Sequence, residues 1–343
     1  MSVASKRSAQ ALAGLSVSAL AWWAAARGIS WRAAWDAARD GDYRFLVPYA
    51  ALFVAIHLVR VLRWRLLLGP VNRVRFRRLN AATAVGMMAV QILPFRMGEL
   101  ARPTLVADGV RLPFAAALSS VVVERLVDGL SATLLLVLAA LALPPELPGL
   151  PVVRAAGLAA FAAFAALTGA LALAWWKRSF TVRLTERLLR PISVRLAERS
   201  SRVVDAFIEA LRFAPGGARV PLLLVLTVAY WALAAASIRV LAMALGLHLS
   251  VAASALVLGT VVLGVMIPAG PAMVGTFQAG VVAGLSLALP AFELGARGVA
   301  FANVLWGAQV GLQVAMGLLF LASPHIRTGL LLRGCVAGPG PRS

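Results

Sequence analysis

The stretch LPFRMGELARP (residues 93–103) places three charged side chains between two prolines at the end of an apolar segment. Arg96 and Arg102 carry forked guanidinium groups, whose geometry matches carboxylates and phosphates. Glu99 lies between them and can position them or carry a proton. Because charges in apolar surroundings are costly unless they are paired, these residue types indicate an anion-binding site, an internal ion-pair network, or both.

A second charged cluster lies in residues 119–130, which otherwise read as an apolar helix. Glu124 and Asp128 are four residues apart and so share one helix face. Arg125 is within reach of Asp128, and an arginine of the first cluster is within reach of Glu124, which relieves the repulsion between the two acids. Three interpretations stay open: an ion-pair clamp, a phosphate-binding headgroup site, or charges placed at a membrane interface.

The composition predicts an all-α membrane protein that crosses the bilayer several times. Of the 343 residues, 61% are hydrophobic and 13% are charged, whereas soluble domains are about 25% charged. The net charge of +20 does not require a nucleic acid, because the arginines cluster between apolar spans. With one cysteine, Cys335, and three scattered histidines, we expect no disulfide within the chain, no metal site and no cofactor.

Apolar segments must position the charged clusters, and six of them are long enough to cross a bilayer. They lie at about residues 9–29, 45–68, 114–143, 152–176, 219–243 and 298–322. We interpret the first as a retained helix, with a cleaved signal peptide as the alternative. Two further apolar regions are broken: residues 79–93 stop at Pro94, and residues 251–289 are interrupted by IPAGP (267–271).

The distribution of basic residues predicts the orientation. Residues 60–78 hold seven arginines and no acid, and residues 177–213 hold nine basic residues against four acids, so both are predicted to be cytoplasmic. The loop 144–151 has no basic residue and suits the outer face, so the helices on either side of it supply two crossings. Two segments on the same side of the membrane must be separated by an even number of crossings, and these two helices already supply it. Residues 79–113 therefore cannot cross the bilayer once, and they are predicted to form a re-entrant hairpin on the cytoplasmic side.

The same argument predicts an outer re-entrant hairpin at residues 251–289, because no Lys or Arg occurs from 244 to 296. Residues 1–149 then read helix, helix, cytoplasmic hairpin, helix. Residues 150–343 read helix, cytoplasmic amphipathic segment, helix, outer hairpin, helix and short basic tail. We expect an inverted repeat in the inner or plasma membrane with both termini cytoplasmic, and eight ordinary spans are the alternative.

Within the segment 177–213 an apolar stripe recurs at helical spacing. It comprises Val203, Val204, Phe207, Ile208 and Leu211. The surrounding arginines predict a helix lying on the anionic inner leaflet, and a solvated connector is the alternative.

The two charged motifs resemble those of the transmembrane region of the lysylphosphatidylglycerol synthase family, a flippase-like family. Its Gly-Glu-Leu-x-Arg hairpin and Glu-Arg-Leu-x-Asp helix appear as GELARP (98–103) and ERLVD (124–128), and its later Pro-Gly segment corresponds to IPAGPAMVGTFQ (267–278). The resemblance covers essentially the whole chain and implies the movement of polar lipids between leaflets. Relatives are linked to aminoacyl-phosphatidylglycerol, to archaeal protein glycosylation on a lipid carrier and to hopanoid metabolism.

Two features depart from the family pattern. Gln278 stands where the family usually has Glu, so this candidate substrate-binding residue cannot titrate. The soluble aminoacyl-transfer domain of full-length synthases is absent, so we expect no synthase activity and no catalytic residue.

The expected function is that of a flippase or scramblase for an anionic polar lipid, whose headgroup phosphate is held by Arg96, Arg102 and Arg125. The candidate substrate-binding residues are therefore Arg96, Glu99, Arg102, Glu124, Arg125, Asp128 and Gln278. Membrane lipids are the expected partners, together with a second copy of the chain or a protein of lipid biosynthesis. The alternatives are a small-solute transporter of the same inverted architecture, and a membrane enzyme on a lipid phosphate with Glu99, Glu124 and Asp128 as metal ligands. The chain has no GxxxxGK[ST] motif, so any drive must come from a gradient or a partner.

Overall fold

The computed structural model describes residues 31–68, 74–93, 98–107, 112, 114–211, 219–267, 270–289 and 291–323, with Ser16, Ala19, Leu20 and Trp23 before them. The first predicted span, Arg96 and the tail after Ser323 therefore lie outside the described residues, apart from those four.

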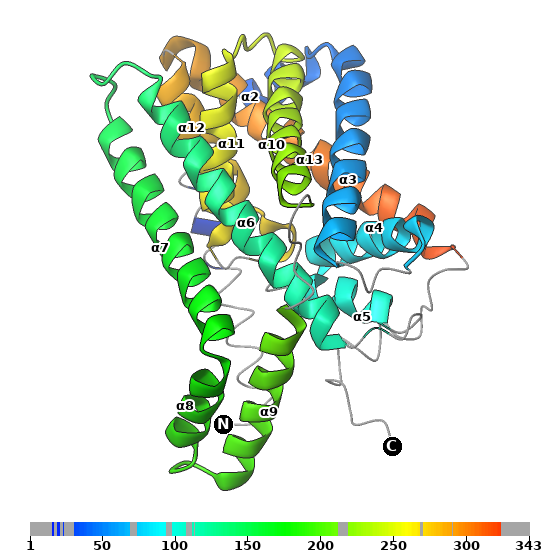
Figure 1. Ribbon diagram of the computed structural model, residues 1–343. Helices are drawn as coiled ribbons and strands as arrows, with labels where there is room; N and C mark the ends of the chain where they lie inside the picture. Colours follow the sequence, from blue (N-terminus) through cyan, green and yellow to red (C-terminus); the bar gives the residue numbers. More distant parts are fainter. Residues whose placement is uncertain are drawn as a thin grey trace.

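The described part of the chain is all-helical, as predicted, and contains no strand. Its α-helices are α2 (Trp31–Arg39), α3 (Leu46–Leu67), α4 (Phe76–Ile92), α5 (Ala101–Ala107), α6 (Phe114–Leu141), α7 (Leu150–Trp176), α8 (Arg178–Leu189), α9 (Val194–Ala210), α10 (Arg219–Met243), α11 (Val251–Met266), α12 (Thr276–Ala288) and α13 (Ala291–Leu321) (Figure 1). Two short 3-10 turns, η1 (Tyr43–Phe45) and η5 (Pro271–Met273), precede α3 and α12.

Five described segments are long and apolar enough to cross a membrane. They are Tyr43–Leu67, Leu150–Trp176, Arg219–Met243, Pro271–Ala288 and Gly295–Leu321. Four of them coincide with predicted spans, and the fifth joins η5 to α12. The 28-residue α6 also matches a predicted span in position, but it is not among the five because Glu124, Arg125 and Asp128 lie near its middle.

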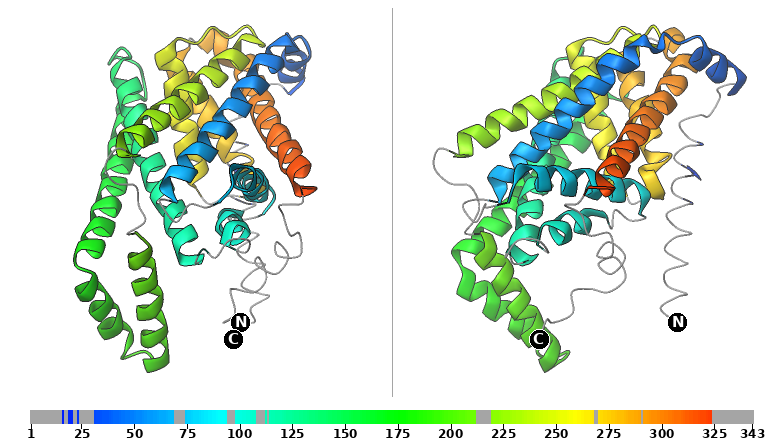
Figure 2. Two further views of the ribbon diagram at one scale, coloured as in Figure 1. Left: turned by 45° about the vertical axis from the view of Figure 1, so that its right-hand side comes forward. Right: turned by 90° about the vertical axis from the view of Figure 1, so that its right-hand side faces the viewer.

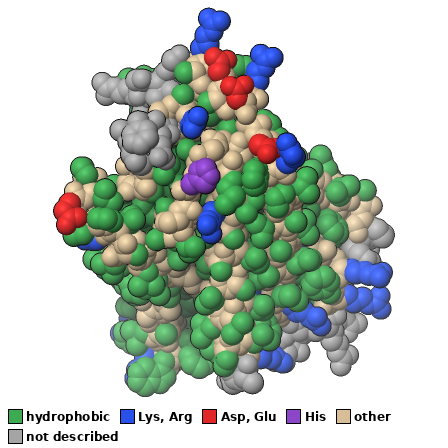
Figure 3. Space-filling model, turned by 90° about the horizontal axis from the view of Figure 1, so that it is seen from above, with side chains coloured by type: hydrophobic (Ala, Val, Ile, Leu, Met, Phe, Trp, Pro, Cys, Tyr) green, Lys and Arg blue, Asp and Glu red, His purple; other side chains and the backbone are tan. Residues whose placement is uncertain are grey.

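The outer surface of the helices is apolar. On α7 only Leu150 and Gly157 are buried, while side chains such as Leu167 are exposed. Hydrophobic side chains also cover much of the face seen in Figure 3. A surface of this kind would drive aggregation in water and is stable in lipid, so the protein is an integral membrane protein.

The two broken regions form close helix pairs. A Cβ atom added to Gly264 of α11 would lie 2.5 Å from the carbonyl oxygen of Thr276, at the start of α12. A Cβ atom added to Gly98 would lie 2.1 Å from the backbone nitrogen of Val90 in α4. Only glycine permits these approaches. In Figure 1, α4 and α5 lie nearer the end of the bundle that carries α8 and α9, and α11 and α12 lie nearer the opposite end.

The remaining packing connects the two halves of the chain. α3 lies against α10, α6 packs along α11, and α13 packs along α4. Figure 2 shows α3 and α10 running side by side, with α13 beyond them. Buried apolar residues such as Val257 and Phe301 form the core between these helices.

The arginine-rich segment forms two antiparallel helices, α8 and α9, instead of the single amphipathic helix that the sequence predicts (Figure 1). Arg178 bonds to both Asp205 and Glu209 and so joins the two helices. In the predicted apolar stripe, Ile208 is buried in the protein, whereas Val203 is exposed. Part of the stripe therefore packs within the molecule and is not available to a membrane surface.

Candidate charged cluster and central cavity

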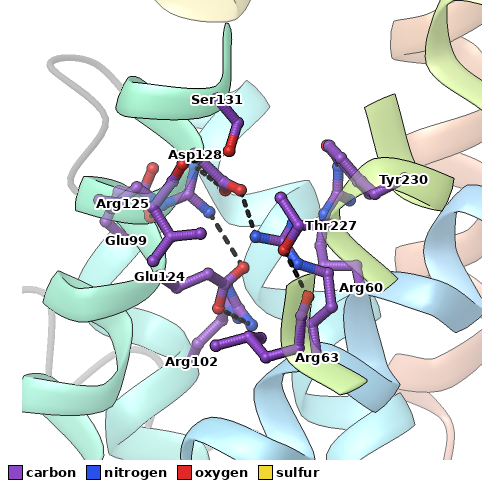
Figure 4. A network of polar contacts seen from close by, with 12 residues as sticks. Arg60, Arg63, Glu99, Arg102, Glu124, Arg125, Asp128, Ser131, Thr227 and Tyr230 are labelled. Atoms are coloured by element: carbon purple, nitrogen blue, oxygen red, sulfur yellow. Dashed lines mark hydrogen bonds and ion pairs between the residues drawn. The ribbon is translucent and has the colours of Figure 1, made fainter. Parts of the chain in front are cut away.

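Three segments bring seven charged side chains together, and a fourth adds a tyrosine (Figure 4). Arg60 and Arg63 come from α3, Glu99 and Arg102 from the turn before α5 and from α5, Glu124, Arg125 and Asp128 from α6, and Tyr230 from α10. The helical spacing of the α6 residues turns Glu124 and Asp128 to the same side, as the sequence predicts.

The buried centre of the cluster is the pair of Arg102 and Glu124. The two guanidinium nitrogens of Arg102 donate to the two carboxylate oxygens of Glu124 at 3.2 and 3.0 Å, and neither side chain has exposed surface. The Arg102 guanidinium also lies 4.3 Å from the centre of the Trp64 ring. Gly86 makes room for Arg102, because a Cβ atom there would lie 2.3 Å from Cγ of that arginine. This pair therefore holds α3, α4, α5 and α6 together.

Arg63 forms a second buried ion pair. Its Nη2 atom donates to Oδ1 of Asp128 at 2.5 Å, and the arginine side chain has no exposed surface. Its guanidinium also lies 5.0 Å from the centre of the Tyr230 ring. The pair joins α3 to α6 and leaves Asp128 with one carboxylate oxygen for other partners.

Arg125 lies among three carboxylates at longer distances. Its closest approaches are 3.5 Å to Glu99, 3.6 Å to Glu124 and 4.0 Å to Asp128. About a third of the Arg125 side chain is exposed, in contrast to Arg63 and Arg102. Arg125 is thus the most exposed charged side chain of the α6 group, and a ligand can reach it.

Arg60 has a different partner. Its Nη2 atom donates to the hydroxyl oxygen of Tyr230 at 2.7 Å, and its guanidinium lies 5.3 Å from the centre of that ring. Within the described part of the chain, no carboxylate forms an ion pair with Arg60.

A cavity of about 660 Å³ opens beside the cluster. Its walls come from α3, α4, α6, α7, α10, α11, α12 and α13 and from both turns, at Glu99–Leu100 and Ala272–Met273. Most of the lining is apolar, as at Phe53, Val121 and Leu258. The polar lining side chains include Arg60, Glu99, Arg125, Asp128, Tyr230, Gln91, Gln309 and Gln313. The volume lies in the usual range for small-molecule sites, and the lining is amphipathic.

The structure separates the predicted site residues into two groups. Glu99, Arg125 and Asp128 line the cavity, whereas Arg102 and Glu124 are buried beneath it and paired with each other. The expected ion pair between an arginine of the first motif and Glu124 is thus present.

Gln278 belongs to neither group. Its Oε1 atom accepts a hydrogen bond from the backbone nitrogen of Gly275 at 2.7 Å, and its Nε2 atom lies 3.5 Å from Oδ1 of Asn303. The side chain is buried and does not line the cavity. Its contacts hold the start of α12 in place against α13.

The sequence did not predict Arg60, Arg63 or Tyr230 as site residues. The density of arginines predicts a cytoplasmic loop at residues 60–78, but α3 continues to Leu67, so that Arg63 is buried and Arg60 lines the cavity. Their spacing of three residues, which puts them on one helix face, was the available signal.

The predicted metal alternative finds no support in the cluster. Among the described residues, no three His, Cys, Asp or Glu side chains are grouped so that they could hold a metal ion. Glu124, one of the three proposed ligands, uses both oxygens for Arg102.

The comparisons with known proteins agree with the two charged motifs. No curated protein and no solved structure matches the chain. The family model of the lysylphosphatidylglycerol synthase TM region matches residues 11–322, which is most of the chain and includes every residue of the cluster. The protein therefore belongs to the family of the lysylphosphatidylglycerol synthase TM region.

Proposed function

We propose that the protein moves an anionic polar lipid between the leaflets of the membrane, as a flippase or scramblase. The observation that carries this proposal is the central cavity, which combines a long apolar wall with a charged end at Arg125, Glu99 and Asp128. A phospholipid has the same division, because its acyl chains are apolar and its headgroup carries a phosphate. In this proposal Arg125 contacts the phosphate, and the carboxylates keep Arg125 in position.

The packing supports an inverted repeat of α3–α6 and α10–α13. Exchanging α3 with α10, α4 with α11, and α6 with α13 maps the observed contacts onto one another. The contact of α6 with α11 becomes the contact of α13 with α4, and the contact of α3 with α10 maps onto itself. This reciprocity is expected if residues 1–149 and 150–343 each contribute one repeat and the working site lies between them.

Two re-entrant hairpins complete the proposed architecture. The first comprises α4, the turn at Gly98 and α5, and the second comprises α11, η5 and α12. Both ends of the α11–α12 pair lie toward one end of the bundle, and α8 and α9 extend from the other (Figure 1). In an inner or plasma membrane with α8, α9 and both termini in the cytoplasm, the hairpins would enter from opposite sides and enclose the polar end of the cavity.

The buried pairs have a supporting role in this proposal. They hold α6, which carries Arg125, against the neighbouring helices. The two pairs are Arg102 with Glu124 and Arg63 with Asp128. The earlier expectation that Arg102 contacts the phosphate directly would require the Glu124 pair to break. We therefore assign Arg102 to positioning, and Arg96 stays a candidate from the sequence alone.

The test uses the purified protein in vesicles of phosphatidylcholine with a trace of fluorescent phosphatidylglycerol. A membrane-impermeant reductant bleaches only outer-leaflet label in empty vesicles. We expect it to bleach most of the label when the protein is present. Arg125→Gln and Glu99→Gln should slow this movement at least tenfold, and Arg239→Gln, an exposed arginine of α10, serves as the control. Unchanged bleaching relative to empty vesicles would contradict the proposal.

The same vesicles address the solute-transporter alternative. Loaded with radiolabelled phosphate or an organic anion, they should retain it while the lipid moves. Flux of the solute without movement of the lipid would favour the alternative.

A further inference from the structure

We propose that Arg60 and Tyr230 form an oxyanion subsite at the seam between α3 and α10, and that this subsite holds the phosphate of the transported lipid. The inference deepens the proposed function and rests on it for the claim that the bound phosphate is carried across the membrane. The binding step stands on the geometry of the two side chains.

The charged side chains of the cluster do not balance among the described residues. Four guanidinium groups, those of Arg60, Arg63, Arg102 and Arg125, share three carboxylates among the described residues. The other three arginines each lie within 4.0 Å of at least one carboxylate, so the excess positive charge belongs to Arg60. A charged guanidinium in a largely apolar cavity is stabilised by an anion. An anionic ligand beside Arg60 would supply this stabilisation.

Hydrogen-bond donors remain on two side chains that line the cavity. Arg60 uses one N–H for the hydroxyl oxygen of Tyr230, and its other N–H groups donate to no described residue. Tyr230 accepts that bond, and its own O–H donates to none of the described residues. Both side chains line the cavity and lie side by side in Figure 4. A forked cation beside a hydroxyl donor suits a tetrahedral phosphate, whose several oxygens accept bonds from both.

The surroundings keep Arg60 in this position. The ring of Tyr230 lies close to both Arg60 and Arg63, with its centre 5.3 and 5.0 Å from the two guanidinium carbons. Arg63 is fixed in turn by Asp128. Because α3 and α10 are the matching helices of the two proposed repeats, an anion bound at Arg60 and Tyr230 would lie close to the axis that relates them.

The experiment measures lipid binding separately from lipid movement. The full-length protein in detergent is titrated with dioleoylphosphatidylglycerol and with dioleoylglycerol, which lacks the phosphate, and the complexes are counted by native mass spectrometry. We expect the wild type to prefer the phosphate lipid. Arg60→Gln should reduce this preference about tenfold or more, Arg60→Lys should retain part of it, and Tyr230→Phe should reduce it several-fold.

Arg65→Gln is the matched control, because it removes the same charge from an exposed position on the same helix. Inorganic phosphate, added as a competitor, distinguishes the two sources of this chemistry. Displacement of the lipid at millimolar phosphate would indicate a general phosphate site, and no displacement would indicate that the acyl chains are part of recognition. Both results retain the subsite.

Equal binding of both lipids by the wild type, or an unchanged preference in folded Arg60→Gln and Tyr230→Phe proteins, would overturn the subsite. Tyr230→Phe removes one oxygen atom only, so it keeps the test valid if Arg60→Gln does not fold. If the wild type, Arg60→Gln and Tyr230→Phe all move lipid at the same rate, the proposed subsite is wrong and the proposed function is retained. If the lipid binds through Arg60 and does not move, the proposed function fails and the subsite stands.

Discussion

Arg102 and Glu124 face each other through two parallel hydrogen bonds of 3.2 and 3.0 Å in a place with no exposed surface on either side chain. They come from α5 and α6, and the ring of Trp64 in α3 covers the guanidinium. The pair is therefore the point at which the first proposed hairpin is fixed to two helices of the bundle. One turn farther along α6, Asp128 accepts a single hydrogen bond from Arg63 of α3 and so forms a second ion pair.

Removal of one member of this pair is expected to destabilise the protein strongly. Arg102→Met leaves the Glu124 carboxylate buried without its main partner, and such a loss costs about 3–5 kcal/mol. The double variant Arg102→Met/Glu124→Leu removes both charges and should recover most of this stability. Thermal unfolding in detergent measures the effect. A double variant less stable than either single variant would contradict the assignment of the pair as a clamp.

Gly98 provides the second prediction. A methyl group at this position would overlap the backbone of Ala89 and Val90 in α4, with the nearest atom at 2.1 Å, so Gly98→Ala should force the turn away from α4. We expect a lower unfolding temperature and slower lipid movement. Gly169 in α7 is the matched control, since a Cβ atom there meets nothing within 4 Å. Gly169→Ala should have no adverse effect, and equal loss in both variants would contradict the close packing.

The contact between α8 and α9 should depend on pH. Hydrogen bonds from Arg178 lower the pKa of Asp205 below the ordinary value for an aspartate. A lowered pKa in the folded state stabilises the contact above the ordinary aspartate pKa, and this stabilisation is lost as the pH falls through the lowered value. Hydrogen exchange in α8 and α9, corrected for its intrinsic pH dependence, should rise below about pH 4. Arg178→Gln should raise exchange at neutral pH and remove most of the change, and an identical pH profile in that variant would contradict the prediction.

The proposed orientation predicts which positions share a side of the membrane. In a Cys335→Ser background, single cysteines replace Glu146 in the α6–α7 loop, Ala107 at the end of α5 and Arg187 in α8. An impermeant thiol reagent should reach the cysteines at 107 and 187 from the cytoplasm and the cysteine at 146 from outside. A cysteine at 107 that reacts together with the one at 146 would show that residues 79–113 cross the bilayer.

The sequence predicted the helical class, four of the five apolar segments long enough to cross a membrane, and an ion pair between Glu124 and an arginine of the first motif. Continuous apolar runs identify helices in lipid, and a buried carboxylate requires a cation close to it. The sequence also predicts that Arg102 contacts the ligand, whereas the structure buries this side chain completely against Glu124. The sequence could not indicate this, because it contains no measure of how deep a residue lies in the fold.

Arg60 and Gln278 illustrate what the sequence could not supply. Arginines near the end of a span usually mark the cytoplasmic side, so Arg60 and Arg63 were counted with the loop that follows. Arg60 donates to Tyr230, 170 residues away, and Arg63 pairs with Asp128, 65 residues away, so only the fold brings these partners together. Gln278 stands where the family usually has an acid, yet its amide is used to secure the turn at Gly275.

The central claim is that the cavity holds a lipid headgroup between two hairpins that enter from opposite faces. A cryo-electron microscopy structure of the protein in nanodiscs of phosphatidylglycerol tests it most directly. The account predicts lipid density in the cavity with its phosphate beside Arg60, Tyr230 and Arg125, and with α5 and η5 at membrane depth. A cavity without lipid, or a segment 79–113 that passes straight through the bilayer, would contradict it.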